Sequence, residues 1–197
     1  IELRPLASAS RQLARVSDQT KWSLDIDVQS GNYIDGKNTF GVTAGATDGK
    51  DNLDSPEPPV FDRYISLYSV LENAKGKKQK ITSDFRGVSD SLQVWDLILD
   101  SKVDQDIATM NLNVVGDIGT NVLWFIDMQN GQAHDLSQTS NSTFSIDLGP
   151  DQLSNRYKLV YGNEDEAGAL VQDIVALIPK EFSLGNNYPN PFNPSTT

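Results

Sequence analysis

The sequence predicts an all-β protein, an antiparallel β-sandwich of the immunoglobulin-like kind with extended N- and C-terminal tails. Two observations carry this prediction. Short segments with alternating apolar and polar residues recur along the chain, and each is bounded by Gly, Asn, Asp or Ser. About eight to ten such segments at this spacing are typical of a sandwich, and no long helix is evident. The 197 residues are 38% hydrophobic and 22% charged, which is the composition of a folded protein.

The first alternating segment, KWSLDIDVQ, shows the pattern most clearly. Trp22, Leu24 and Ile26 fall on one face of the predicted strand, and Asp25 and Asp27 fall on the other. The same period, with many β-branched and aromatic residues, predicts further strands in RYISLYSV, QKITSDFR, LQVWDLILD, ATMNLNVVG, NVLWFIDMQ, QAHDLSQ, TFSIDLG and RYKLVYG.

Two connections between these strands resemble hairpins. In FIDMQNGQAHDL, the pair Asn130-Gly131 supplies the positive φ angles of a two-residue turn. In VVGDIGTNVLW, Gly116 and Gly119 bracket a slightly longer loop. Both glycine positions therefore predict reversals of the chain between neighbouring strands.

The chain divides into three predicted parts. Residues 1–20 form an arm or a short helix, residues 21–178 form the sandwich, and residues 179–197 form a linker and a further segment. Near the end of the sandwich, DEAGALVQDIVALIP is ambiguous between helix and strand. Its apolar residues from Val171 to Ile178 suit a final strand or an extended edge segment.

The longest stretch without a strand pattern is NYIDGKNTFGVTAGATDGKDNLDSPEPPVF. Loops of this length inside a domain are uncommon and often functional. Asp48, Asp51 and Asp54 recur within it, and oxygen ligands on a flexible backbone suit Ca²⁺, although the spacing of an EF-hand is missing. The stretch is therefore either a calcium site or an acidic surface loop rich in Asx turns.

The overall charge and the missing cysteines exclude several classes of protein. A formal net charge of -11 argues against nucleic-acid binding and against attachment to anionic membranes. Without cysteine there are no disulfides, thiolate metal sites or cysteine nucleophiles. No apolar run is long enough for a membrane helix, and the missing initiator Met and signal run suggest a mature or excised fragment.

The sequence offers no recognisable catalytic constellation. His134, the single histidine, lacks an accompanying Gly-x-Ser-x-Gly motif and is expected to be a partly exposed strand residue. Carboxylates are plentiful but fall at outward positions of the alternating strands, where solvated charges belong; these are Asp25, Asp27, Asp96, Asp100 and Asp127. We therefore expect a protein that is not an enzyme.

Aromatic residues raise the alternative of a carbohydrate-binding module. Such modules use exposed Trp and Tyr side chains as platforms for sugars. Trp22, Trp95 and Trp124 all occur within strong strand patterns, and their expected place is the core. The sequence does not decide whether the tyrosines are buried or exposed, so a sugar-binding face stays open as an alternative.

The last residues resemble a known family. Pro179, Phe182 and Leu184 lead into Asn187, Tyr188, Pro189, Asn190, Pro191, Phe192, Asn193 and Pro194, and together they resemble the opening of the type A sorting domain of the type IX secretion system. The strands that follow in that family are missing, so we expect only its entry segment here. The body of the chain, in WSLDIDV, FGVTAGATDGKDNLDSPEPP and LWFIDMQNGQAHDL, resembles non-catalytic β-sandwich modules that precede such sorting domains.

These resemblances imply an exported protein that resides outside the cell or at its surface. The expected function is that of a structural or interaction module whose partners are other subunits or surface components. Its extended tails suggest self-assembly into a filament or surface layer by strand addition. The alternative is a carbohydrate-binding module of a secreted glycanase, with polysaccharide as its partner.

Overall fold

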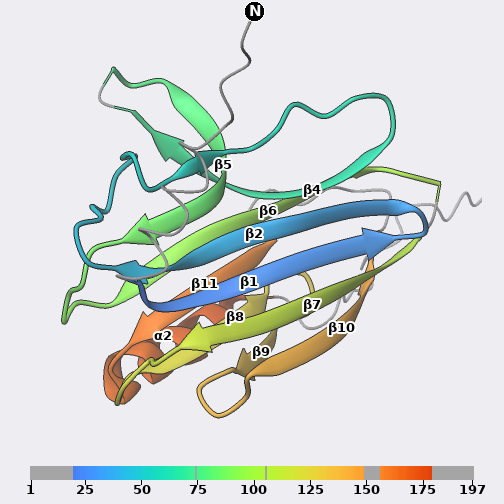
Figure 1. Cartoon of the computed structure of the whole chain (residues 1–197). Helices are drawn as coiled ribbons and strands as arrows, with labels where there is room; N and C mark the ends of the chain where they lie inside the picture. Colours follow the sequence, from blue (N-terminus) through green and yellow to red (C-terminus); the bar gives the residue numbers. More distant parts are fainter. Residues whose placement is uncertain (1–19, 74, 105, 149–155, 179–197) are drawn as a thin grey trace, which may run out of the picture.

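The computed structural model describes residues 20–73, 75–104, 106–148 and 156–178. Within these ranges the chain forms eleven strands and one α-helix, α2 (Glu164–Leu177), so the all-β prediction is confirmed (Figure 1). The predicted N-terminal arm, except Thr20, and the predicted C-terminal segment lie outside the described residues. The strands are β1 (Thr20–Ser30), β2 (Tyr33–Thr43), β3 (Ser55–Pro56), β4 (Tyr64–Glu72), β5 (Lys78–Arg86), β6 (Gln93–Lys102), β7 (Ile107–Gly116), β8 (Val122–Asp127), β9 (Gln132–Asp135), β10 (Asn141–Asp147) and β11 (Tyr157–Gly162).

The strands form one continuous sheet in the order β10-β7-β1-β2-β5-β4-β6-β11-β8-β9, with β3 added to β5. The sheet curls into a half-barrel, so that β1, β2 and β7 lie in front of β11 and β8 in Figure 1. This arrangement is sandwich-like, as predicted. Two details differ from the prediction: the two layers belong to one sheet, and β2 and β5 pair in parallel.

Strand β5 explains both differences because it turns the corner between the two layers. Its first half pairs with β4, for example Ile81 with Ser69, and its second half pairs with β2, for example Ser83 with Thr39. A strand that changes partners along its length joins the two layers through its own backbone. The alternation of residues within each strand does not encode which strand lies beside it.

Strand β2 is a correction to the sequence prediction, which placed these residues in a long loop. It pairs with β1 from Ser30↔Tyr33 to Thr20↔Thr43, with a register shift between Ile26 and Val28. At the irregularity Lys37 has a φ of 70°, and its N–H donates to Asp27 Oδ1 at 3.0 Å. A bulge of this kind interrupts the period of two, which hides the strand from pattern analysis. The loop is thus reduced to residues 44–63, which contain β3.

The main core fills the space between the two layers. Trp22, Leu24, Ile26 and Val28 are each 0% exposed, which confirms the predicted inner face of β1. The other layer contributes Trp95, whose ring meets that of Trp22 edge to face with centroids 5.9 Å apart. Core side chains thus come from both ends of the sheet, which holds the curl together.

Helix α2 decides between the two alternatives left open for this stretch, and the final strand considered from Val171 to Ile178 is not formed. Asn163 caps the helix, its Oδ1 accepting from the N–H of Glu166 at 2.9 Å. Buried Ala167, Val171 and Ile174 recur at helical spacing and pack on the outer face of β8 and β11. In the described part of the chain, no helix is long and apolar enough to cross a membrane.

One of the two predicted hairpins is confirmed, and the other is not formed. β8 and β9 do form a hairpin, but its loop has four residues, because Asp127 pairs with Gln132 and only Gly131 of the Asn-Gly pair has positive φ. Gly116 and Gly119 do bracket a loop, and both have positive φ. That loop is not a hairpin, because β7 and β8 are not neighbours in the sheet and the chain crosses between layers there.

Candidate functional site

The two end strands of the sheet, β9 and β10, define the candidate site. β9 pairs with β8 and β10 pairs with β7, and within the described residues no ladder joins β9 to β10. Between them lies a cavity of about 260 Å³, called the seam cavity below. Its lining comes from the β8–β9 hairpin (Phe125, Asp127, Asn130, Gln132, His134), from β10 (Thr143, Phe144, Ser145, Ile146), from β7 (Met110) and from β11 (Tyr157).

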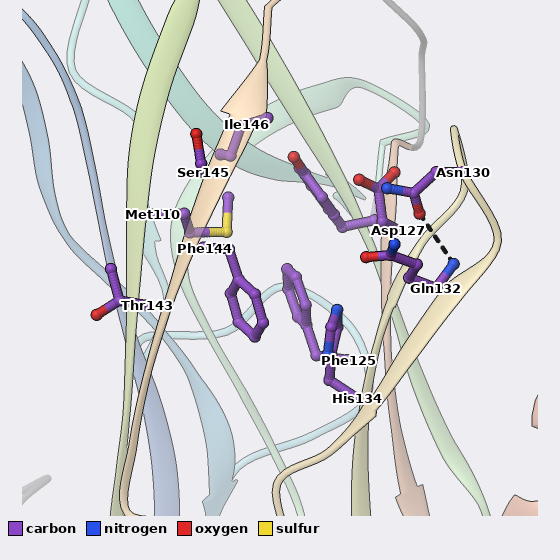
Figure 2. A pocket seen from close by; sticks show the side chains of 11 residues that line it. Met110, Phe125, Asp127, Asn130, Gln132, His134, Thr143, Phe144, Ser145 and Ile146 are labelled. Atoms are coloured by element: carbon purple, nitrogen blue, oxygen red, sulfur yellow. Dashed lines mark hydrogen bonds between the residues drawn. The ribbon is translucent and has the colours of Figure 1, made fainter.

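Aromatic rings form the apolar wall of the seam cavity. Figure 2 shows Phe125, Phe144 and His134 pointing toward one another from three different strands. The ring centroids of His134 and Phe144 lie 4.3 Å apart, and those of Phe125 and Phe144 lie 6.2 Å apart in a stacked arrangement. Phe125 also stacks on Tyr157 at 5.0 Å. These contacts give the cavity a fixed apolar surface that suits an aromatic or branched side chain.

Polar side chains gather at one end of the cavity, where the β8–β9 turn lies (Figure 2). Asp127 Oδ1 accepts the N–H of Gln129 at 2.8 Å, and Asn130 Oδ1 accepts the N–H of Gln132 at 2.9 Å. These local bonds fix the turn, while the exposed side chain of Gln132 stays at the rim. The cavity is therefore apolar along its wall and polar at its mouth.

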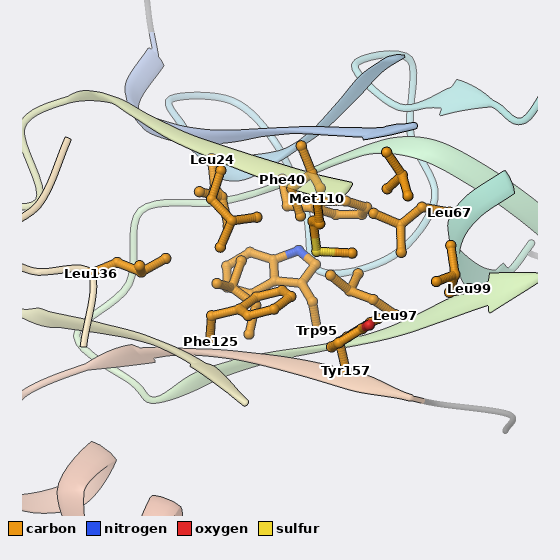
Figure 3. Packing of buried hydrophobic residues seen from close by; sticks show 14 of the residues in the cluster. Leu24, Phe40, Leu67, Trp95, Leu97, Leu99, Met110, Phe125, Leu136 and Tyr157 are labelled. Atoms are coloured by element: carbon orange, nitrogen blue, oxygen red, sulfur yellow. The ribbon is translucent and has the colours of Figure 1, made fainter. Parts of the chain in front are cut away.

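Tyr157 brings an unusual group into the seam cavity. Only 2% of the residue is exposed, and its hydroxyl is buried without a hydrogen-bond partner among the described residues. The guanidinium of Arg156 lies beside it without meeting hydrogen-bond geometry, and burial raises the pKa of Tyr157. Figure 3 shows Tyr157 among core side chains such as Leu97 and Trp95. A buried hydroxyl without a partner is destabilising, so this group marks a place where a ligand atom would be stabilised.

His134 lies on β9 and is partly exposed, as the sequence predicts. Burial against the apolar wall lowers its pKa, and the nearby Asp127 carboxylate opposes this effect. The hydrogen bonds of the described residues include none from the His134 ring to a hydroxyl or carboxylate. Thr143 Oγ1, on the same wall, donates instead to Asn111 Oδ1 at 2.9 Å. The ring of His134 packs against that of Phe144, which is the arrangement of a packing residue.

The three residues of the calcium hypothesis lie in the loop before β4. Asp51 Oδ2 accepts from the N–H of Thr47 at 2.8 Å, and Asp54 accepts from the backbone N–H groups of Asp51 and Phe85 at 2.7 and 3.0 Å. The carboxylates of Asp51 and Asp54 therefore fasten the loop to itself and to β5. Across the described ranges, no group of three or more His, Cys, Asp or Glu side chains is arranged to hold a metal ion. A calcium site at Asp48, Asp51 and Asp54 stays a prediction.

Other carboxylates have structural roles that the sequence did not reveal. The five aspartates predicted to point outward are indeed exposed or half-buried. Asp35 is different, because its Oδ2 accepts the N–H of Leu67 at 2.5 Å and so ties β2 to β4. Glu57 Oε1 accepts from Ser66 Oγ at 2.7 Å and ties the long loop to β4. Burial raises the pKa of both carboxyls, and these long-range contacts leave no local signal in the sequence.

The tryptophans give little support to a sugar platform. Trp22 and Trp95 are fully buried, as predicted, and Trp124 is half-buried beneath α2. Of the tyrosines left undecided, Tyr157 and Tyr161 are also buried. A planar row of exposed aromatic rings is therefore not present among these residues.

The sorting motif from Asn187 to Pro194 lies outside the described residues. No protein-family model matches the chain, and no solved structure matches it. The seam cavity thus stands as the candidate site on its own geometry. No local pattern in the sequence predicts the cavity, because its lining comes from five strands, although His134 and the Asn130-Gly131 turn were singled out.

Proposed function

We propose that this chain is a non-catalytic interaction module of an exported, surface-associated protein, and that it acts by holding an extended polypeptide segment along its seam. The observation that supports this proposal is the pair of sheet ends, β9 and β10, on either side of an apolar cavity. Unpaired strand edges present backbone N–H and C=O groups that an added strand can bind. The aromatic wall offers the pocket for its side chains.

Hydrogen exchange on the full chain tests this mode of binding. If a segment lies along the seam, the amides of β9 and β10 that point away from β8 and β7 will be protected. Amides facing an empty seam will exchange far faster than amides inside a strand ladder, and that result would refute the proposal. Amides within the β1–β7 ladder provide the reference for full protection.

Self-assembly is the stronger form of the proposal, in which the segment comes from a neighbouring copy. Removing residues 180–197 and comparing the molar mass and the electron micrographs of both chains tests this form. Assemblies that depend on the tail support it, whereas identical particles from both chains exclude a role for the tail.

The proposed location rests on the resemblance of Asn187 to Pro194 to the entry of a sorting domain. Cell fractionation of the source organism, with an antibody against the sandwich, tests it: the proposal requires the protein in the medium or on the surface. A polysaccharide pull-down separates the interaction module from the carbohydrate-binding alternative, because only the latter predicts retention on an insoluble glycan.

A further inference from the structure

We propose that β10 of a second copy of this chain pairs with β10 across a two-fold axis, so that the partner's Phe144 completes the seam cavity. This inference rests on the proposed function, in which the seam holds an extended segment. It names that segment as a strand of the described fold and its source as a second copy. The product would be a symmetric dimer in which one sheet runs through both subunits.

The backbone of β10 has one bonded side and one open side in the described sheet. The N–H of Leu148, the residue after β10, donates to the carbonyl of Asp106 at 2.8 Å. Because the bonds of an antiparallel ladder alternate, the even-numbered residues of β10 direct their backbone groups toward β7. The N–H and C=O groups of Thr143 and Ser145 therefore point away from β7, and none of the described strands pairs with this side. A further strand can bond here.

The composition of β10 does not protect this open edge. Edge strands usually avoid pairing with other chains through a lysine, a proline, a bulge or a very short length. β10 has seven residues, Asn-Ser-Thr-Phe-Ser-Ile-Asp, in an uninterrupted register with β7, and its one charged residue is the last. The other end strand, β9, has only four residues. β10 is therefore the end of the sheet that suits strand addition.

β10 is complementary to itself when two copies run antiparallel about Phe144. Thr143 then lies opposite the partner's Ser145, and the two form a hydrogen-bonded pair because their backbone groups point outward. Asn141 lies opposite the partner's Asp147, which places an amide beside a carboxylate and keeps like charges apart. This register also aligns all seven residues of both strands.

The same axis brings the partner to the side of the seam cavity. Phe144 is half-exposed, and the centroid of its ring lies 4.3 Å from that of His134 on β9 (Figure 2). In the dimer the partner's Phe144 lies directly opposite in a non-hydrogen-bonded pair, where Cα atoms are about 4.5 Å apart and side chains touch. Its ring covers the exposed side of Phe144 and adds an aromatic surface to the cavity. Because His134 lies beside the axis, the β9 edges of both copies also face each other.

Sedimentation equilibrium of the full chain over a range of concentrations measures the dimer. The test variant is Ser145→Pro, which removes an N–H that points away from β7 and so keeps the bonds within the chain. Its matched control is Ser145→Ala, which removes only the hydroxyl. We expect Ser145→Pro to weaken dimer formation at least about tenfold, because two symmetry-related hydrogen bonds are lost. Ser145→Ala should leave it unchanged, and protected amides in the β1–β7 ladder report that each variant is folded.

Engineered disulfides test the register and do not depend on the proline variant. The chain has no cysteine, so Thr143→Cys and Ser145→Cys can be prepared separately and then mixed. Hydrogen-bonded partners in antiparallel strands have Cα atoms about 5.5 Å apart, which is within the range of a disulfide. The mixture should oxidise to a disulfide-linked dimer at least about tenfold faster than either variant alone, whose cysteines lie two residues out of register.

The outcomes separate this inference from the proposed function. A dimer that Ser145→Pro weakens, with cross-linking specific to the mixture, supports both. A chain that is monomeric at every concentration overturns the inference. So does a dimer that Ser145→Pro leaves intact, or a mixture that cross-links no faster than its components. In each of these cases protected edge amides of β9 and β10 preserve the proposed function, because another segment then lies along the seam, whereas unprotected edge amides overturn the proposed function as well.

Discussion

Strand β11 carries a tyrosine near each end, and the two residues have opposite surroundings. Tyr161 is 1% exposed and its hydroxyl donates to the carbonyl of Ile118 at 3.4 Å. Tyr157 is 2% exposed, yet its hydroxyl has no hydrogen-bond partner in the described part of the chain, and the residue lines a cavity. The two tyrosines are thus equally buried, but among the described residues only the hydroxyl of Tyr161 has a hydrogen-bond partner.

The region around Tyr161, called the closed end here, is packed throughout. Trp22 contacts both Trp95 and Tyr161, with ring centroids 5.9 and 4.6 Å away, and the backbone of Gly116 lies against that of Lys21 and Trp22. At the seam, comparable rings surround an opening of about 260 Å³. The same core can therefore stabilise the fold at its closed end and offer a binding surface at the seam.

The largest expected effect comes from removing an indole at the closed end. Trp22→Ala should lower the free energy of unfolding by about 3–5 kcal/mol, because a fully buried ring is lost from a region that cannot collapse around the gap. Phe144→Ala at the seam should cost about 1–2 kcal/mol, since this ring is already half-exposed. Urea denaturation of the two variants measures both values. Equal losses would contradict the distinction between the two ends.

A buried carboxyl at the closed end, that of Asp84, should make the free energy of unfolding depend on pH. Asp84 is 1% exposed, and burial raises its pKa to about 6 although Arg86 opposes the shift. The folded state therefore favours the neutral carboxyl, and stability should fall as pH rises from about 4 to about 6, by up to about 3 kcal/mol. Asp84→Asn should reduce this decline, and the carboxyls of Asp35 and Glu57, whose pKa values burial also raises, should contribute to what remains.

The measurement is urea denaturation at a series of pH values on the parent and on Asp84→Asn. His134→Gln at the seam serves as the control, because the lowered pKa of His134 acts in the opposite direction and should leave the decline in place. A parent protein whose stability is flat between pH 4 and 6 would refute the assignment to Asp84.

Two glycines allow the same substitution at both ends. Gly116 has a φ of 92°, and a Cβ there would lie 2.5 Å from the carbonyl oxygen of Lys21. Gly116→Ala should therefore cost about 2–3 kcal/mol through strain and backbone displacement. Gly131 has a φ of 71°, but its Cβ would meet only Ile178 at ordinary contact distance. Gly131→Ala should cost about 1 kcal/mol, and thermal unfolding of both variants would disprove the comparison if the order were reversed.

The smallest expected effect is the sharpest test of the two tyrosines. Tyr161→Phe should cost up to about 1 kcal/mol, because it removes one long hydrogen bond. Tyr157→Phe should be neutral or stabilising, because among the described residues its buried hydroxyl has no hydrogen-bond partner to lose. Urea denaturation of the two variants measures this difference. A loss of stability for Tyr157→Phe as large as that for Tyr161→Phe would contradict the comparison.

Much of the fold could be predicted from local patterns because alternation reports which face of a strand is buried. The inner face of β1, with Trp22 and Leu24, followed directly from that period. β2 was hidden because the bulge at Lys37 breaks the period, and the stretch of α2 was left open between helix and strand although Ala167, Val171 and Ile174 stand at helical spacing. The candidate site was predicted only in fragments, since His134 and Asn130-Gly131 carry no sign of Phe144 or Tyr157 beside them.

The sequence by itself determined the all-β class, most strand positions and the absence of cysteine chemistry, because these depend on composition and on neighbours within a few residues. Only the tertiary structure decided the parallel pairing of β2 with β5, the curl of the sheet and the meeting of β9 and β10 at the seam. Those features depend on which distant segments bury their apolar faces together. The surroundings of the Tyr157 hydroxyl were also decided by the tertiary structure, because distant segments bury it without placing a hydrogen-bond partner beside it within the described ranges.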